Sequence, residues 1–139
     1  MEKSSVQITE FIPQRKPFVF VDALLNCTPG SAETSFAVTD TNVLVRNGVL
    51  TTSGLIEHIA QSCVAKTGFD ARAENKAVSI GYIGNVKNLS VSRNPKVGET
   101  LHTTVLFGEK IGGIQLCEAT VRCGDEVIAH TSIRTAQEE

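Results

Sequence analysis

The sequence has no excess of charge of either sign. Its 13 Lys and Arg residues stand against 15 Asp and Glu residues, which gives a formal net charge of -2. Domains that bind nucleic acids usually carry a strongly basic surface, so we expect no nucleic-acid partner. The Lys and Arg residues also form no polybasic run, which argues against binding to an anionic membrane surface.

Long apolar runs are missing as well. No run approaches the roughly 20 apolar residues that a membrane-spanning helix needs. The first residues, Met1 to Val6, contain neither the apolar stretch nor the small-residue cleavage site of a signal peptide. We therefore expect a cytoplasmic protein without a membrane partner.

The cysteines do not form the patterns that bind metals. There are four of them, Cys27, Cys63, Cys117 and Cys123, without a Cys-x-x-Cys pair and without a histidine at zinc-finger spacing. This predicts small apolar core residues in a reducing compartment, with a disulfide or a metal site as the alternatives. We expect neither a metal nor a cofactor.

What remains is the composition of an ordinary globular domain. The chain has 139 residues, 41% of them hydrophobic and 20% charged, and no linker, repeat or low-complexity tract. This predicts one domain over residues 1–139. Apolar and alternating segments between Gly and Pro signals predict strands at 18–25, 31–38, 77–84, 101–107, 114–123 and 127–135.

One segment, residues 54–66, has a helical pattern. Ser53 precedes it as an N-cap residue, and we expect the helix to end at Gly68. Apolar residues cover most of the helix circumference, which predicts a buried helix. One such helix must cover the apolar face of the whole sheet. The prediction is an α+β hotdog fold, an antiparallel sheet of five to six strands wrapped around one long central helix.

Two motifs carry a resemblance to a known family. Residues 12–22 read Ile-Pro-Gln-Arg-Lys-Pro-Phe-Val-Phe-Val-Asp, and residues 54–61 read Gly-Leu-Ile-Glu-His-Ile-Ala-Gln. They resemble the opening and the central helix of the bacterial 3-hydroxyacyl-[acyl-carrier-protein] dehydratases, over nearly the whole chain. The Gly-x-x-Glu-x-x-Ala-Gln form is also similar to dehydratase-like proteins of aryl polyene gene clusters.

The resemblance implies that Glu57 is the catalytic acid. Dehydration of a 3-hydroxyacyl thioester expels hydroxide, a poor leaving group that needs a positioned acid. Backbone N–H groups at the helix start, near Gly54, would stabilise the developing enolate oxygen. Gln61, at i+4, is placed to orient the Glu57 carboxylate. The alternative is a surface helix residue, which the apolar neighbours of Glu57 oppose.

The resemblance fails at the second catalytic position. The family has a histidine in a Gly-His-Phe-Pro-Gly loop before the helix, and counting back from Glu57 without gaps places this position at Val43. The family also has a histidine where this chain has Gln14. His58 follows Glu57 but points about 100° away from it. It is a packing residue or, alternatively, a residue that contacts substrate.

Further expectations concern partners. Gly84 either lies close to the acyl chain, as the family pattern implies, or is a turn glycine. Lys87, Arg93, Lys96 and Lys110 either form a solvated face or attract an acidic carrier protein. The substrate carrier is acyl carrier protein or coenzyme A. Single hotdog domains usually build their channel between two subunits, so we expect a homodimer, with a higher oligomer left open.

Three functions fit these observations. The first is a dehydratase-like lyase of fatty-acid or polyene-type biosynthesis, in which Glu57 works with a nonstandard or missing histidine. The second is an acyl thioesterase in which the helix carboxylate activates water or attacks the thioester. The third is a catalytically degenerate acyl-binding or partner subunit in a mixed dimer. Val43 favours the last two, whereas the two motifs favour the first.

Overall fold

The computed structural model describes residues 7–75 and 81–137. In chain order its elements are the 3-10 helix η1 (Ile8–Glu10), the strands β1 (Ala23–Thr28), β2 (Ser31–Ala37), β3 (Val45–Arg46) and β4 (Val49–Leu50), the helix α1 (Thr52–Ala73), and the strands β5 (Gly81–Val91), β6 (Thr100–Ile111), β7 (Ile114–Cys123) and β8 (Glu126–Gln137).

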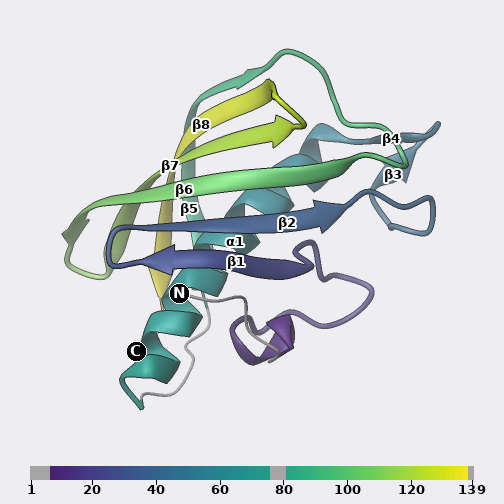
Figure 1. Ribbon diagram of the computed structural model, residues 1–139. Helices are drawn as coiled ribbons and strands as arrows, with labels where there is room; N and C mark the ends of the chain where they lie inside the picture. The colour runs from purple at the N-terminus through teal and green to yellow at the C-terminus, as the bar shows by residue number, and fades with distance from the viewer. Residues whose placement is uncertain (1–6, 76–80, 138–139) are drawn as a thin grey trace.

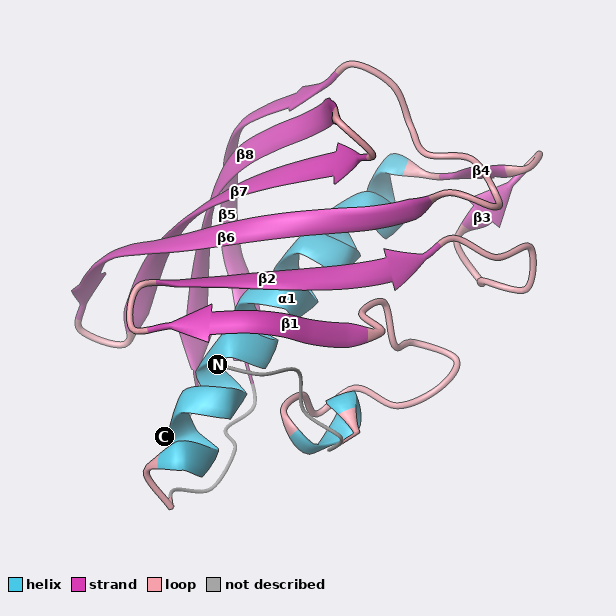
Figure 2. Cartoon of the chain, viewed as in Figure 1, coloured by secondary structure: helices cyan, strands magenta, loops and turns pink. Residues whose placement is uncertain are grey.

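Six strands form one sheet in the order β1-β2-β6-β7-β8-β5, and every neighbouring pair is antiparallel. The sheet curves around α1, which crosses its inner face diagonally (Figure 1). Figure 2 shows that α1 is the long helix that this sheet encloses. The hotdog prediction, with its five to six strands, is therefore confirmed.

The start of α1 lies earlier in the chain than the sequence predicted. The helix begins at Thr52, and Thr51 is its N-cap residue, because the Thr51 hydroxyl oxygen accepts a hydrogen bond of 3.2 Å from the Gly54 N–H. Ser53 therefore lies inside the first turn. The prediction erred because two threonines and a serine precede the apolar run and each could cap it.

The end of α1 lies later, at Ala73 rather than at Gly68. Gly68 is a packing residue instead of a helix terminator. A Cβ atom at this position would stand 1.9 Å from the carbonyl oxygen of Phe11. Glycine thus allows the segment after η1 to lie directly against the helix.

The helix is buried by polar as well as apolar contacts. Leu55, Ile59 and Cys63 are fully buried, as predicted. Ser62 is also buried and exchanges a 2.8 Å hydrogen bond with Thr34 on the inner face of β2. Among the described residues, no helix is both long enough and apolar enough to cross a bilayer.

The strands confirm most of the sequence predictions. The range 114–123 is that of β7, and β2, β6 and β8 lie within three or four residues of their predicted bounds. The predicted strand 18–25 lies too early in the chain, since β1 spans Ala23–Thr28. The predicted strand 77–84 overlaps β5 from Gly81 onward, and its first residues lie outside the described chain.

The β3–β4 hairpin was missed. Asn47 and Gly48 form its turn with φ angles of 54° and 77°. An Asn-Gly pair with positive φ at both residues is a strong signal for a two-residue hairpin turn. The flanking strands have only two residues each, too few to show alternation.

The cysteines are free thiols, and three of the four are buried in agreement with the core prediction. Cys63 of α1 faces Cys117 of β7. The hydrogen bond between them, together with burial, raises the pKa of Cys63 well above its ordinary value. A thiol kept protonated in this way is a poor nucleophile.

Candidate active site

Glu57 projects from the second turn of α1 and is half-buried. Its Oε2 accepts a hydrogen bond of 2.7 Å from Nε2 of Gln61, one helical turn further on. This is the contact that the i+4 spacing predicted. Among the described residues the second oxygen, Oε1, accepts no hydrogen bond, so it is free to contact another molecule.

Gln61 holds more than the carboxylate. Its side chain is fully buried. Nε2 also donates to the carbonyl oxygen of Phe18 at 2.8 Å, and Oε1 accepts from the Phe20 N–H at 2.7 Å. Both amide protons and the amide oxygen are therefore used. Gln61 thereby links the Glu57 carboxylate to the backbone of Phe18 and Phe20, in the segment before β1, and fixes the orientation of the carboxylate.

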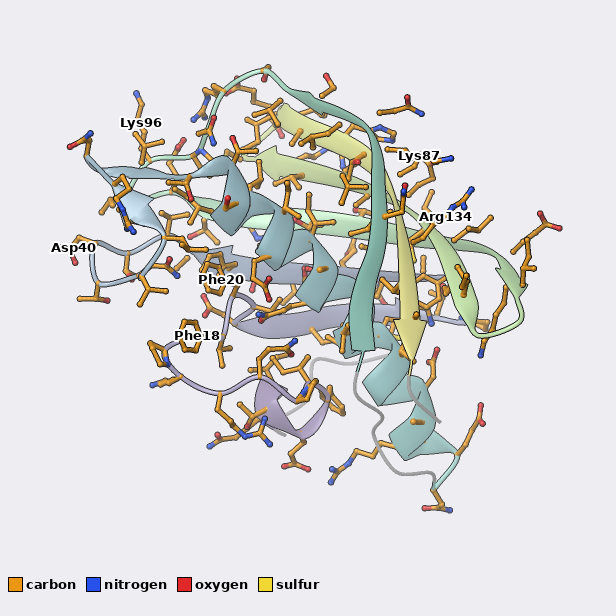
Figure 3. The ribbon with its side chains drawn as sticks, turned by 180° about the vertical axis from the view of Figure 1, so that it is seen from behind. Phe18, Phe20, Asp40, Lys87, Lys96 and Arg134 are labelled. Carbon is orange, nitrogen blue, oxygen red and sulfur yellow. The ribbon has the colours of Figure 1, made fainter. Side chains whose placement is uncertain are left out.

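The sequence did not predict the part that this segment plays. Phe20 is 1% exposed, while Phe18 is 59% exposed next to a backbone carbonyl that Gln61 holds (Figure 3). A large exposed aromatic side chain on a tethered backbone is available to contact a substrate or a second subunit. The opening motif, residues 12–22, includes both Phe18 and Phe20. Their contacts with Gln61 are tertiary, so the motif alone does not predict them.

His58 lies in the core. Its Nδ1 is 2.7 Å from the carbonyl oxygen of Phe20, and its Nε2 is 2.7 Å from the Thr103 hydroxyl. The ring stacks on Phe36 with 5.4 Å between centroids. Burial lowers the pKa of His58 to about 4. Both nitrogens are occupied, which favours the packing interpretation over a contact with substrate.

The loop before the helix offers no replacement for the missing histidine. Val43 is partly buried and packs against the core, and its carbonyl oxygen accepts a 2.7 Å hydrogen bond from Arg46. Gly54 lets this loop approach the helix, since a Cβ there would stand 2.5 Å from Leu50 Cδ1 and 3.1 Å from Leu44 Cβ. Gly54 thus packs against Leu44 and Leu50, the residues at the two ends of the β3–β4 hairpin.

Gly84 lies elsewhere, in the edge strand β5. The register between β5 and β8 shifts between Ile83 and Asn85, so Gly84 occupies an irregular position in the sheet. A glycine at such a point permits a bulge or a close approach of another chain. Both interpretations of Gly84 stay open, and its proximity to the acyl chain remains a prediction.

The site contains carboxylate and amide groups but no metal cluster. Within residues 7–75 and 81–137, no group of three His, Cys, Asp or Glu side chains is arranged to hold a metal ion. The backbone N–H groups of Thr52 and Ser53 precede the first intrahelical hydrogen bonds and have no acceptor in the helix. The half-buried Glu57 carboxylate, held by Gln61, lies one turn beyond these N–H groups.

A curved antiparallel sheet around one long helix defines a hotdog-fold protein, here with a half-buried glutamate in the second turn of that helix. The model of the ApeP-like family, described as ApeP dehydratase, matches residues 6–139. The chain therefore belongs to the ApeP-like dehydratase family. Among curated proteins, no significant match to the chain was found.

Solved structures share the fold. A chain of the dehydratase heterocomplex ApeI:P from Xenorhabdus doucetiae superposes with a TM-score of 0.90, at 17% identity over 98% of this chain and 93% of that one. A hypothetical thioesterase from Streptococcus pneumoniae, solved with coenzyme A, has a TM-score of 0.64 at 8% identity, with 83% and 84% of the two chains covered. Escherichia coli PaaI has a TM-score of 0.61 at 11% identity, over 81% and 80%.

Proposed function

We propose that this protein is a subunit of a cytoplasmic dehydratase that converts 3-hydroxyacyl thioesters, carried by acyl carrier protein or coenzyme A, into 2-enoyl thioesters. The observation that carries the proposal is the Glu57 carboxylate, which Gln61 fixes through Oε2 while Oε1 stays free. Membership of the ApeP-like dehydratase family supports the reaction class.

In the proposed reaction a base removes a proton from C2 of the acyl chain, and the C3–O bond breaks. Glu57, in its carboxylic acid form, donates its proton to the departing hydroxide, which leaves as water while the C2–C3 double bond forms. Positioned acids and bases of this kind contribute about 10²–10⁴-fold each to the rate. Backbone N–H groups at the start of α1 would stabilise the enolate oxygen.

The base is the missing part, and a second, dehydratase-like subunit is its proposed source. Counting back from Glu57 places Val43 at the histidine position of the 3-hydroxyacyl-[acyl-carrier-protein] dehydratases that the sequence resembles, and His58 is buried with both nitrogens occupied. The most similar of the structures described above comes from a dehydratase heterocomplex. In a mixed dimer of this kind, our chain contributes Glu57 and the partner contributes the histidine.

The dimer itself is proposed to form along β5. This strand is at the edge of the sheet, where its outer backbone groups are available to pair with a second subunit. Pairing two such edges would join the sheets and remove both exposed edges. A homodimer made in this way would lack the histidine in both of its sites.

The test is turnover of 3-hydroxyacyl and 2-enoyl thioesters by the chain alone and after coexpression with a dehydratase-like partner, following the double bond and free thiol together. We expect dehydration by the mixed assembly only, and loss of about 10²–10⁴-fold of it when Glu57→Gln replaces the wild-type chain. Full activity of the Glu57→Gln assembly would overturn the catalytic assignment.

Hydrolysis is the second candidate, because a hotdog thioesterase needs only one helix carboxylate and a water molecule. The similarity to a thioesterase fold seen with coenzyme A supports keeping this candidate. Release of free thiol by the chain alone, without a change in the double bond, would select it. Binding of acyl thioester without any turnover in either assembly would select the non-catalytic subunit.

A further inference from the structure

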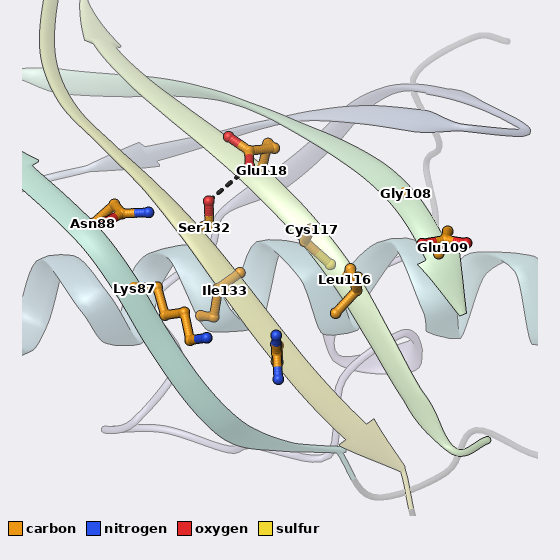
Figure 4. Close-up of a pocket in the computed structure, with 10 residues that line it drawn as sticks. Lys87, Asn88, Gly108, Glu109, Leu116, Cys117, Glu118, Ser132 and Ile133 are labelled. Carbon is orange, nitrogen blue, oxygen red and sulfur yellow. Dashed lines mark hydrogen bonds between the residues drawn. The ribbon is translucent and has the colours of Figure 1, made fainter. Parts of the chain in front are cut away.

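The outer face of the sheet contains a cavity that the acyl-thioester site does not explain. It measures about 360 Å³, within the range of small-molecule pockets, and its lining residues come from β5, β6, β7 and β8. The helix α1, with Glu57, packs on the opposite face of the sheet (Figure 4).

Two irregularities in the strands shape this cavity. In β5 the register with β8 shifts between Lys87 and Ser90, with Asn88 at a φ of 55°. In β6 the register with β7 shifts between Phe107 and Lys110. Such bulges re-aim side chains and are common next to functional sites.

Both irregularities are held by specific hydrogen bonds. The Thr131 hydroxyl donates to the carbonyl oxygen of Lys87 at 2.8 Å. The Gln115 amide donates to the carbonyl oxygens of Gly108 at 3.0 Å, Glu109 at 3.3 Å and Leu116 at 3.0 Å. The cavity is therefore a built feature of the sheet rather than a loose fit between side chains.

The cavity lining contains two cations, Lys87 and Arg134, and two carboxylates, Glu109 and Glu118. Lys87 and Arg134 lie on the outer face of neighbouring strands, because Lys87 pairs with Ser132, two residues from Arg134. This diagonal spacing lets both cations reach one ligand. Neither forms an ion pair with a described residue. The acid nearest in register, Glu118, is engaged by the Ser132 hydroxyl at 2.6 Å and by His130 at 3.1 Å.

The remaining walls are suited to a hydrocarbon group. Leu116, opposite Arg134 in the register, presents its side chain to the cavity. The aliphatic stems of Lys87 and Arg134 add apolar surface beneath their charged ends. Glu109, at the β6 bulge, is the other carboxylate in the lining.

We propose that this outer cavity binds a small amphipathic anion, a carboxylate with a hydrocarbon or aryl tail, between Lys87, Arg134 and Leu116. Two cations without acid partners provide charge complementarity to a carboxylate, which they bind through charge-assisted hydrogen bonds. The apolar wall provides contact with the tail. The proposal is independent of the reaction at Glu57, so its failure leaves that site unaffected.

The experiment titrates the isotope-labelled full-length chain with octanoate and follows amide shifts of Lys87, Leu116 and Ser132 by NMR. Matched titrations use octan-1-ol, acetate and inorganic phosphate. We expect saturable shifts with octanoate. Acetate, which lacks the hydrocarbon tail, and octan-1-ol, which lacks the carboxylate, should each bind at least about tenfold more weakly.

The double variant Lys87→Met/Arg134→Met should lower octanoate affinity by about tenfold or more. The control Arg122→Met removes an exposed cation from the outer face of β7 outside this cavity and should leave the affinity within about twofold.

Three results in which octanoate binds would overturn the proposal, and so would absence of octanoate binding. The first is equal binding of octanoate and octan-1-ol, and the second is saturation by phosphate alone. The third is a double variant that binds octanoate like wild type. Absence of binding together with a changed oligomeric state of the double variant in light scattering would assign the face to a subunit interface instead.

Discussion

Two ionisable side chains of the central helix, Glu57 and Lys66, have different surroundings. Glu57, near the helix start, is half-buried and keeps one carboxylate oxygen free of described partners. Lys66, in the second half, is fully buried. Its ammonium donates to Asp70 Oδ2 at 2.8 Å and to the Thr28 carbonyl at 2.9 Å, and lies 5.1 Å from the Phe107 ring centroid.

The difference shows which charge in a buried helix is available for chemistry. A charge among apolar residues does not by itself identify a catalytic group, because Lys66 has a full set of structural partners. A buried or half-buried charge with unused hydrogen-bonding capacity is the more informative feature. By this criterion we propose that the start of α1 is the reactive end, whereas its second half is structural.

The largest expected contrast in stability is between alanine substitutions at these two positions. Lys66→Ala removes the stem and the ion pair from the core and should lower the free energy of unfolding by about 2–4 kcal/mol. Glu57→Ala should cost about 1 kcal/mol or less, because it removes one hydrogen bond at a half-buried position. Urea denaturation of the two variants measures both values.

A matched control separates volume from charge at Lys66. Lys66→Met keeps the length of the side chain and should stay within about 1.5 kcal/mol of wild type. A Lys66→Ala variant as stable as wild type would contradict the structural role of the second half of α1.

The sequence predicted the Glu57–Gln61 contact near the helix start better than the contacts of the second half of the helix. The acid and Gln61 were found because they are neighbours within one helical turn, which is a local relation. The Lys66–Asp70 pair was missed because the helix was expected to end at Gly68, and an i+4 pair requires the helix to continue through that residue. The reason for Gly68, the approach of Phe11, is a tertiary contact.

The second prediction tests whether Gln61 positions the carboxylate. Gln61→Met keeps the volume but leaves the Phe18 carbonyl and Phe20 N–H without their partner, which should cost about 1–3 kcal/mol. It should also lower turnover of the folded mixed assembly by about tenfold or more, because the carboxylate is no longer fixed. Steady-state kinetics below the unfolding transition should show the loss in kcat.

Ser62→Ala is the matched control for this prediction. It also removes a buried hydrogen bond, to Thr34, from the next position of the helix, but it does not touch Glu57. We expect a loss of stability without a comparable loss of kcat. Equal kcat losses in the two variants would mean that Gln61 acts only through folding.

The third prediction restores the missing group at the reactive end. Val43→His in the chain alone should raise dehydration at least about tenfold above the background rate of the wild-type chain alone, less than the about 10²–10⁴-fold of a fully positioned base. It should also cost about 1 kcal/mol of stability, since Val43 packs against the core. The control Val45→His alters a second partly buried valine, two residues further on at the start of β3. No gain in folded Val43→His, or an equal gain in both, would show that Val43 is not the histidine position.

The smallest effect concerns the loop that holds the reactive end in place. The Asn94 amide donates to the Leu50 carbonyl at 3.0 Å and to the Thr52 hydroxyl at 3.1 Å, which ties the loop after β5 to the start of α1. Arg93 closes this loop through two 2.8 Å hydrogen bonds to Glu99. These bonds are the main reason that the pKa of Glu99 falls from 4.5 to about 2.

Because the pKa of Glu99 is lower in the folded protein than in the unfolded chain, its charge stabilises the fold fully above about pH 4.5, and this contribution is lost as the pH falls through about 2. The free energy of unfolding should therefore be higher for wild type than for Glu99→Gln at pH 6. This difference between the two proteins should narrow below pH 4.5. Glu109→Gln, at an exposed position of β6, should show no such narrowing.

Hydrogen exchange should locate the acid-induced loosening at the Leu50 and Val97 amides rather than at Lys66. Loosening that begins at Lys66 would reverse the assignment of the two halves of α1.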